Sequence, residues 1–296
     1  MKLEETFNRR QIRALEDGRG GRNTLKRFAE KAATGWKHGG DRPVLICGDP
    51  GQGKTHLLKY NFSKNNIDFY QTPATSSFFG LAIHLAKLAY DFPGERVIVL
   101  FDDVSKFFKG DGLDILKRLF EEKILDYSVS TNWGQIPEEA EEAIRSFRND
   151  SGLGFTVDCS NFQFIVTANT ILPDFLRVNQ LLKKNDGIEN EKISRARDMA
   201  AIRDRCRTLD LSWSPKVQWG NIAEVLLFDG GCDQYELSLE KKLIILNWLW
   251  NQIEDVRNMS IRTAEQLAEI MLEYPQKSGY EEMWWNIHLN QKGRYE

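Results

Sequence analysis

The feature that most restricts the fold of this chain is the segment at residues 48–55, GDPGQGKT, which matches the pattern GxxxxGK[ST]. A short apolar run at 43–47 precedes the segment, and a helix is predicted after it, at 55–62. A glycine-rich turn between a strand and a helix can aim successive backbone N–H groups at one anion. A fortuitous glycine turn would lack this context, so we predict a phosphate-binding loop in an α/β fold.

Each residue type in this loop has a chemical task. The glycines let backbone N–H groups turn inward, Lys54 brings a compact positive charge to the β and γ phosphates, and Thr55 offers a hydroxyl to Mg²⁺. The helix that begins there adds the positive end of its dipole. The residues expected to contact a nucleoside triphosphate are Gly48, Asp49, Pro50, Gly51, Gln52, Gly53, Lys54, Thr55 and His56.

Apolar runs alternate with helical patterns along most of the chain. The run at 96–101 is almost continuously apolar, which is typical of a strand buried on both faces of a parallel sheet. The other strands are predicted at 43–47, 67–71, 162–168 and 208–211. Further helices are predicted at 23–36, 80–90 and 112–126. This alternation predicts an α/β core in which helices sandwich a parallel sheet.

The β signal ends near Ser214, and the later segments have helical spacing. Helices are predicted at 239–253, 263–272 and 281–289. The glycine-rich segment at 17–22, DGRGGR, predicts a flexible turn. We therefore expect an N-terminal linker over 1–22, a nucleotide-binding core over 23–213, and a small helical domain with a C-terminal helix over 214–296.

Two adjacent carboxylates follow the apolar run at 96–101. The carboxyl ends of parallel strands share one edge of the sheet, so Asp102 and Asp103 would lie near the phosphate-binding loop. We assign Asp102 to the Mg²⁺ shell and Asp103 to the orientation and polarisation of the attacking water. The competing interpretation is that both acids only cap the helix that follows them.

Composition excludes several classes of protein. The net charge of −3 argues against a protein that coats nucleic acid, although a local basic groove remains compatible with it. No CxxC pair exists, so a zinc site is not expected, and small buried side chains are expected at Cys47, Cys159, Cys206 and Cys232. The longest apolar run is too short to span a bilayer, and no secretory signal is apparent, which predicts a cytoplasmic protein without membrane contact.

With these motifs in place, the chain resembles the AAA+ ATPases over roughly residues 25–272. Residues 164–170, FIVTANT, are similar to a sensor-1 strand, in which Asn169 would help to position the water. That asparagine could instead simply end a strand. Residues 201–211 are similar to the segment that holds the arginine finger, with Arg205 as the expected finger and Arg203 as the alternative. Residues 259–267 are similar to the start of a sensor-2 helix, which implies that Arg262 senses the γ-phosphate.

The resemblance implies a P-loop NTPase core followed by a helical lid, ATP and Mg²⁺ as ligands, and a homo-oligomer, expected to be a ring, in which Arg205 reaches a neighbour's site. Phe78-Phe79-Gly80 stands where many members carry a pore loop, but the two phenylalanines fit a core equally well.

The branch of the family stays open, because two departures point in different directions. Asp103 replaces the usual glutamate, and the Asp-Asp pair resembles helicase loaders and replication initiators. The clamp-loader "SRC" element is similar to Asp204-Arg205-Cys206. In contrast, the segment at 151–161 resembles the insertion, often a β-hairpin, that precedes sensor 1 in Lon-like, ClpX-like and MoxR-like members, or it is only a surface loop.

The expected function is that of an ATP hydrolase that couples Mg-ATP binding and hydrolysis to the remodelling or loading of a macromolecule, either DNA or protein. Because aspartate is one methylene shorter than glutamate, the alternative is an ATP-gated assembly switch or a binding scaffold with little hydrolysis. The helix with Trp284, Trp285 and Ile287 is expected to pack on the helical domain or to dock a partner.

Overall fold

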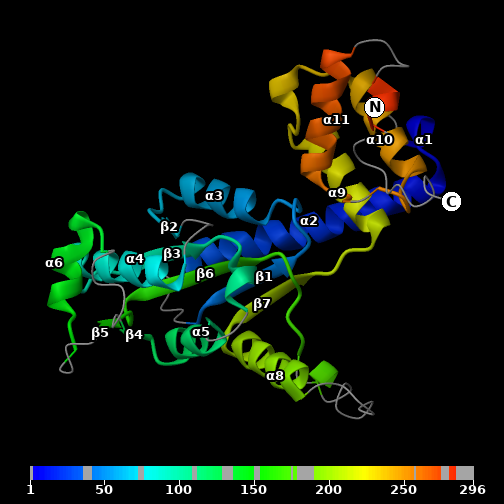
Figure 1. Cartoon of the computed structure of the whole chain (residues 1–296). Helices are drawn as coiled ribbons and strands as arrows, with labels where there is room; N and C mark the ends of the chain where they lie inside the picture. The colour runs from blue at the N-terminus through cyan, green and yellow to red at the C-terminus, as the bar shows by residue number, and fades with distance from the viewer. Residues whose placement is uncertain are drawn as a thin grey trace. The chain divides into compact units, whose positions relative to one another are not determined.

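The structure is a computed structural model that describes residues 3–35, 42–72, 77–108, 112–128, 136–149, 154–174, 176–178, 190–256, 258–274 and 280–284 (Figure 1). The chain divides into two compact units. Unit 1 consists of Met1–Phe28, Gly48–Leu57 and Leu211–Glu296, and unit 2 consists of Ala29–Cys47 and Leu58–Asp210.

A five-stranded sheet of order β2-β3-β6-β1-β7 forms the centre of unit 2. The strands are β1 (Val44–Gly48), β2 (Tyr70–Thr72), β3 (Val97–Phe101), β6 (Phe162–Ala168) and β7 (Arg207–Leu211). The pairs β2–β3, β3–β6 and β6–β1 are parallel. Every residue of β1, β3 and β6 is buried, as expected for strands covered on both faces. The predicted α/β class is therefore confirmed.

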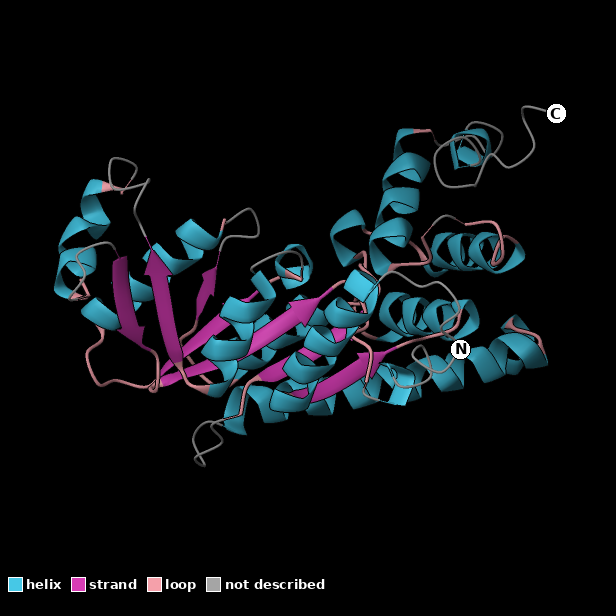
Figure 2. Cartoon of the chain, turned by 60° about the horizontal axis from the view of Figure 1, so that its bottom comes forward, coloured by secondary structure: helices cyan, strands magenta, loops and turns pink. Residues whose placement is uncertain are grey.

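Helices lie on both faces of this sheet (Figure 2). They include α3 (Lys54–Lys64), α4 (Phe78–Asp91), α5 (Gly112–Glu121) and α8 (Asn190–Arg205), and a short 3₁₀ turn, η2 (Val104–Phe107), follows β3. Alternate strand residues, among them Leu45, Phe101 and Phe164, pack with α4, α5 and α8 into one apolar core. The side chains between them point to the opposite face because side chains alternate along a strand.

The predicted helix at 112–126 is wrong at its C-terminal end. The helix α5 stops at Glu121, and Lys123 adopts a left-handed φ of 57° that the helix cannot continue through. The next residues form β4 (Ile124–Ser128), which pairs antiparallel with β5 (Gly154–Asp158). The acidic segment between them forms α6 (Glu138–Ser146). The segment at 151–161 thus contains a strand, β5, but the partner of that strand, β4, begins inside the segment predicted as a helix.

Unit 1 contains the helices α1 (Leu3–Thr6), α9 (Pro215–Phe228), α10 (Leu239–Asn251) and α11 (Ile261–Glu273), the turn η4 (Asp233–Tyr235), and the N-terminal part of α2 (Arg9–Gly35). Their core surrounds Trp219, whose indole N–H donates to the carbonyl of Leu246 at 2.9 Å. Trp284 is fully buried in the same core, so it packs on the helices; Trp285 and Ile287 lie outside the described residues. Among the described helices, none has the length and apolarity that crossing a bilayer requires.

The flexible turn predicted at 17–22 is wrong, because this segment lies inside α2, and α1 and α2 occupy most of the predicted linker. The glycines have a packing role instead. A Cβ atom added at Gly18 would lie 2.2 Å from the backbone carbon of Gly220 in α9, and one added at Gly220 would lie 1.8 Å from the carbonyl oxygen of Ala14. The two helix backbones therefore touch, which only residues without a side chain allow.

Candidate functional site

The glycine-rich loop, residues 48–55, connects β1 to α3 and closes around its own lysine. Gly51 and Gly53 have left-handed φ angles of 77° and 84°, which disfavour any residue with a Cβ atom. Lys54 is buried, and its ammonium group donates hydrogen bonds to the carbonyl oxygens of Gly48 at 2.8 Å and Asp49 at 2.7 Å. The loop residues predicted to hold phosphate thus form a tight turn in which the buried ammonium group is bonded to the first two residues of the loop.

Two side-chain hydrogen bonds brace the glycine-rich loop within unit 1. The buried amide of Gln52 donates to the carbonyl oxygen of Leu211, the last residue of β7, at 3.0 Å. The carboxylate of Asp49 accepts a hydrogen bond of 2.6 Å from Gln218 of α9. Sequence reasoning placed Gln52 in the loop but missed Gln218, which carries no local signal. These contacts hold the loop in one shape, while Thr55 remains partly exposed and His56 exposed.

The first turn of α11 also contacts the glycine-rich loop. The amide N–H of Ile261 donates to the carbonyl oxygen of Gly51 at 3.1 Å, and a Cβ atom at Gly51 would lie 2.4 Å from Cβ of Ser260. Ser260 caps this helix by accepting a hydrogen bond from the amide of Thr263. Arg262 follows Ile261 directly and is exposed, with no hydrogen-bond or ion-pair partner among the described residues. The predicted sensor residue therefore directly follows a residue that contacts the glycine-rich loop.

A buried arginine beside the loop was not foreseen from the sequence. The guanidinium of Arg22 pairs with Asp229 at 2.5 Å and lies 3.4 Å from the amide oxygen of Asn221. A Cβ atom added at Gly53 would lie 3.6 Å from Nη1 of Arg22. Burial raises the pKa of Asp229, but hydrogen bonds from Lys26 and Arg22 and their positive charges outweigh burial and lower it. Asp229 thus keeps a second cation in place near the loop.

At the carboxyl ends of β3 and β6, the polar side chains form one hydrogen-bonded network within unit 2. The hydroxyl of Thr167 donates to the carboxylate of Asp102 at 3.0 Å and accepts from the backbone N–H of Asp103 at 3.0 Å. Asn169 donates to Oδ2 of Asp103 at 2.8 Å. Gln71, from β2, donates to the other oxygen of Asp102 at 3.1 Å. The structure therefore brings together the three residues predicted here and adds two.

Asp103 has a backbone conformation that residues other than glycine rarely adopt. Its φ of 56° lies in the left-handed region, where aspartate is tolerated better than most side chains. The contacts from Thr167 and Asn169 hold it there. These two contacts fix both the backbone and the carboxylate of Asp103 at the end of β3.

The two arginines predicted as finger candidates are engaged within unit 2. Arg205 pairs through two nitrogens with the carboxylate of Glu121 and also donates to the carbonyl oxygen of Ala201 at 2.8 Å. Arg203 pairs with Asp210 at 2.5 Å. Between these two arginines, Asp204 is exposed. A role in a neighbouring subunit would require either guanidinium to leave these partners.

The remaining predicted features lie in the core. The ring of Phe78 packs against Phe107 at 4.4 Å between centroids, and the ring of Phe79 packs against Tyr127 at 5.7 Å. Both rings are partly buried against the core of unit 2, as one of the two interpretations expected. The prediction of small buried thiols is confirmed for Cys47, Cys159, Cys206 and Cys232.

Comparison with known proteins adds no family to this geometry. No family model matches the chain, and no curated protein matches it.

Proposed function

We propose that this chain is an ATP hydrolase of the AAA+ type that couples Mg-ATP binding and hydrolysis to the remodelling or loading of a macromolecule. The strand order is the observation that supports this most strongly. β6 lies between β1, which leads into the glycine-rich loop, and β3, which ends at Asp102. Because these three strands are parallel, the loop, the two carboxylates and Asn169 all follow carboxyl ends at one edge of the sheet, where ligands of such sheets bind.

In this proposal, the glycine-rich loop binds the triphosphate. Lys54 exchanges its hydrogen bonds to the Gly48 and Asp49 carbonyls for bonds to phosphate oxygens, and the loop amides take up the remaining charge. Arg262 approaches the same phosphates from the first turn of α11, which already contacts Gly51. The positive end of the α11 dipole adds to the attraction.

Asp103 accepts a hydrogen bond from the attacking water and increases its nucleophilicity in this mechanism. The amide of Asn169 orients the carboxylate, and Thr167 holds its backbone. The hydroxyl of Thr55 and the carboxylate of Asp102 are hard oxygen ligands that fit Mg²⁺, and Gln71 and Thr167 fix the carboxylate from both sides. When bound, Mg²⁺ neutralises charge on the phosphates.

The direct test compares nucleotide binding and hydrolysis in three variants. Lys54→Ala is expected to lose Mg-ATP binding by calorimetry, whereas Asp103→Asn is expected to bind Mg-ATP and to lose turnover. Lys59→Ala is the matched control, because Lys59 is an exposed cation on the same helix, α3. If Lys54→Ala binds Mg-ATP as well as the unmodified chain does, the proposal is rejected.

The same variants separate a motor from a nucleotide-gated switch. If Asp103→Asn and the unmodified chain hydrolyse ATP equally slowly while ATP still drives their assembly, the switch is the correct function.

The proposed assembly is a homo-oligomer in which Arg205 acts on a neighbour's nucleotide. This role requires Arg205 to exchange Glu121 for a phosphate. Arg205→Ala is then expected to lower kcat by about a thousandfold, the lower end of finger effects, whereas Arg203→Ala should change it little. A specific activity that stays constant from monomer to assembled protein would exclude a finger in trans.

A further inference from the structure

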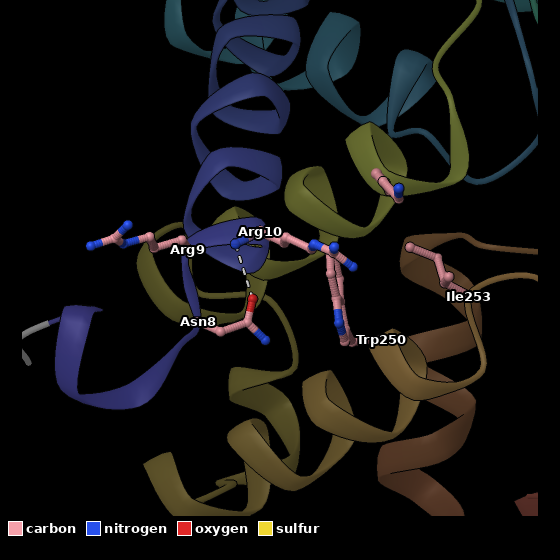
Figure 3. Close-up of a pocket in the computed structure, with 6 residues that line it drawn as sticks. Asn8, Arg9, Arg10, Trp250 and Ile253 are labelled. Carbon is pink, nitrogen blue, oxygen red and sulfur yellow. Dashed lines mark hydrogen bonds between the residues drawn. The ribbon is translucent and has the colours of Figure 1, made fainter.

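A pocket of about 540 Å³ opens in unit 1 where α2 begins (Figure 3). Its volume lies within the range of about 300–1,000 Å³ that is usual for small-ligand sites. Three elements meet there: the start of α2, the start of α9 and the end of α10. The residues that line it are Asn8, Arg9, Arg10, Lys216, Trp250 and Ile253.

The charged side chains of this pocket are all positive. Arg9, Arg10 and Lys216 are exposed, and no carboxylate lines the pocket with them. None of the three has an ion-pair partner among the described residues, in contrast to Arg19, which pairs with Glu224. Uncompensated cations in a recess raise the local positive potential, so the pocket should attract anions.

An aromatic side chain faces the same space. Trp250 is half-buried because its ring packs edge-on against Trp219, with centroids 4.9 Å apart at an interplanar angle of 67°. Figure 3 shows Arg10 and Trp250 pointing toward each other from different helices, whereas Arg9 extends to the other side of α2. Ile253 adds an apolar wall. A cation and an anchored indole thus border one recess.

The start of α2 is held by a reciprocal cap, which keeps this arrangement in place. The side chain of Asn8 accepts hydrogen bonds from the backbone N–H groups of Arg10 and Gln11, both at 3.0 Å. The side chain of Gln11 in turn accepts from the backbone N–H of Asn8 at 3.0 Å, which completes the cap. Because the cap already satisfies these amides, the side chains, not the helix end, provide the binding groups.

We propose that this pocket binds single-stranded nucleic acid, with a phosphate on Arg10 and Lys216 and a base stacked on Trp250. Stacking platforms beside basic side chains are the usual means of binding single strands without sequence preference. A duplex hides the faces of its bases, and an acidic peptide would use the cations but leave the indole without a partner. The inference deepens the proposed function by naming the class of macromolecule, and it rests on that function only for the coupling to ATP.

The test measures the binding of a labelled oligothymidylate, longer than the roughly 4–16 nucleotides that single-strand binding folds cover, by fluorescence anisotropy without nucleotide. The double variant Arg10→Ala/Lys216→Ala is expected to bind at least ~10-fold more weakly and to lower the slope of log K against log [salt] by about 0.7 for each phosphate that the variant no longer neutralises. Trp250→Leu is expected to weaken binding roughly 5- to 150-fold, and Trp250→Phe much less. Arg13→Ala is the matched control, because Arg13 is a cation on α2 that does not line the pocket.

Three results would overturn the inference: unchanged binding by the double variant, equal affinity for a duplex, or equal affinity for a free mononucleotide. If Trp250→Leu fails to fold by circular dichroism, Trp250→Phe and the salt slope of the double variant still decide. Lys54→Ala separates this inference from the ATPase proposal. It should bind the strand normally, so loss of Mg-ATP binding and loss of strand binding are scored independently.

Discussion

The hydroxyl of Thr167 holds the carboxylate network together, and its removal gives the sharpest test of that network. Thr167 is 2% exposed and makes two hydrogen bonds, one to the charged carboxylate of Asp102 and one from the backbone N–H of Asp103. A hydrogen bond to a charged group contributes about 1.5–3 kcal/mol and a neutral one about 0.5–1.5 kcal/mol. A valine methyl group returns about 0.8 kcal/mol by burial. Thr167→Val should therefore lower the free energy of unfolding by about 1–4 kcal/mol.

Urea unfolding followed by circular dichroism measures this loss as a shift of the midpoint at constant slope. Thr167→Ser keeps the hydroxyl and should lose only about 1 kcal/mol. Thr156→Val is the matched control, because Thr156 is exposed and its hydroxyl donates to Asp126 at 2.6 Å. Because water can replace this exposed hydroxyl as the donor to Asp126, that change should stay within about 1 kcal/mol. If Thr167→Val unfolds within ~0.5 kcal/mol of the unmodified chain, the network contributes nothing and the reasoning is wrong.

Three further predictions follow from unit 1 and from the thiols. Asp229→Asn should lower stability by about 2–4 kcal/mol at neutral pH, since it leaves Arg22 buried without its carboxylate. Because the folded chain lowers the pKa of Asp229, this contribution is fully present above the unfolded-state pKa of about 3.9 and is lost as the pH falls through the pKa of the folded state. A variant as stable as the unmodified chain at neutral pH would contradict this prediction. Gly220→Ala should lose about 3 kcal/mol or more in thermal unfolding, because the new Cβ would meet the Ala14 carbonyl oxygen, and an unshifted melting temperature would refute the helix contact. Burial raises the pKa of Cys159, Cys206 and Cys232 to about 12, so thiol reagents at pH 8 should label them only after denaturant is added. Labelling of these thiols in the folded chain would contradict their burial.

The sheet could be predicted from the sequence because strands covered on both faces leave an unmistakable apolar run. β6 begins and ends where it was expected, at Phe162 and Ala168. The end of α5 could not be predicted in the same way. Ile124 continues the helical spacing of the preceding leucines, and only its pairing with Asp158 in a distant segment makes it part of a strand. Local periodicity carries no information about such a partner.

At the glycines of α2, the sequence predicted a turn where the structure has a helix. A local rule assigns Gly18 to a turn, since glycine weakens a helix by about 1 kcal/mol relative to alanine. The structure retains the helix because Gly18 allows its backbone to touch that of Gly220, which lies in a distant part of the sequence. Tertiary packing outweighs the local propensity there.

The residues of the candidate site that directly follow a strand could be predicted from the sequence. Asp102, Asp103 and Asn169 follow apolar runs, and the structure brings them within one network. Thr167 was missed although a polar residue inside an apolar strand is a usable signal. Arg22 had no signal, because its partners in and after α9 are unrelated to its neighbours in sequence.

The contact between α2 and α9 also fixes which face of α2 is turned toward α9. Ala14, Gly18 and Arg22 follow one another at four-residue intervals and so form one stripe along the helix, which is the stripe that meets Gly220 and Asn221. Deleting one residue between Gly18 and Arg22 would swing the arginine by about 100° around the axis, away from Asp229. The number of residues between Ala14 and Arg22 is therefore more tightly constrained than the identity of the residues between them. Substitutions on the face of α2 that points away from α9 should be tolerated, whereas an insertion or deletion should not.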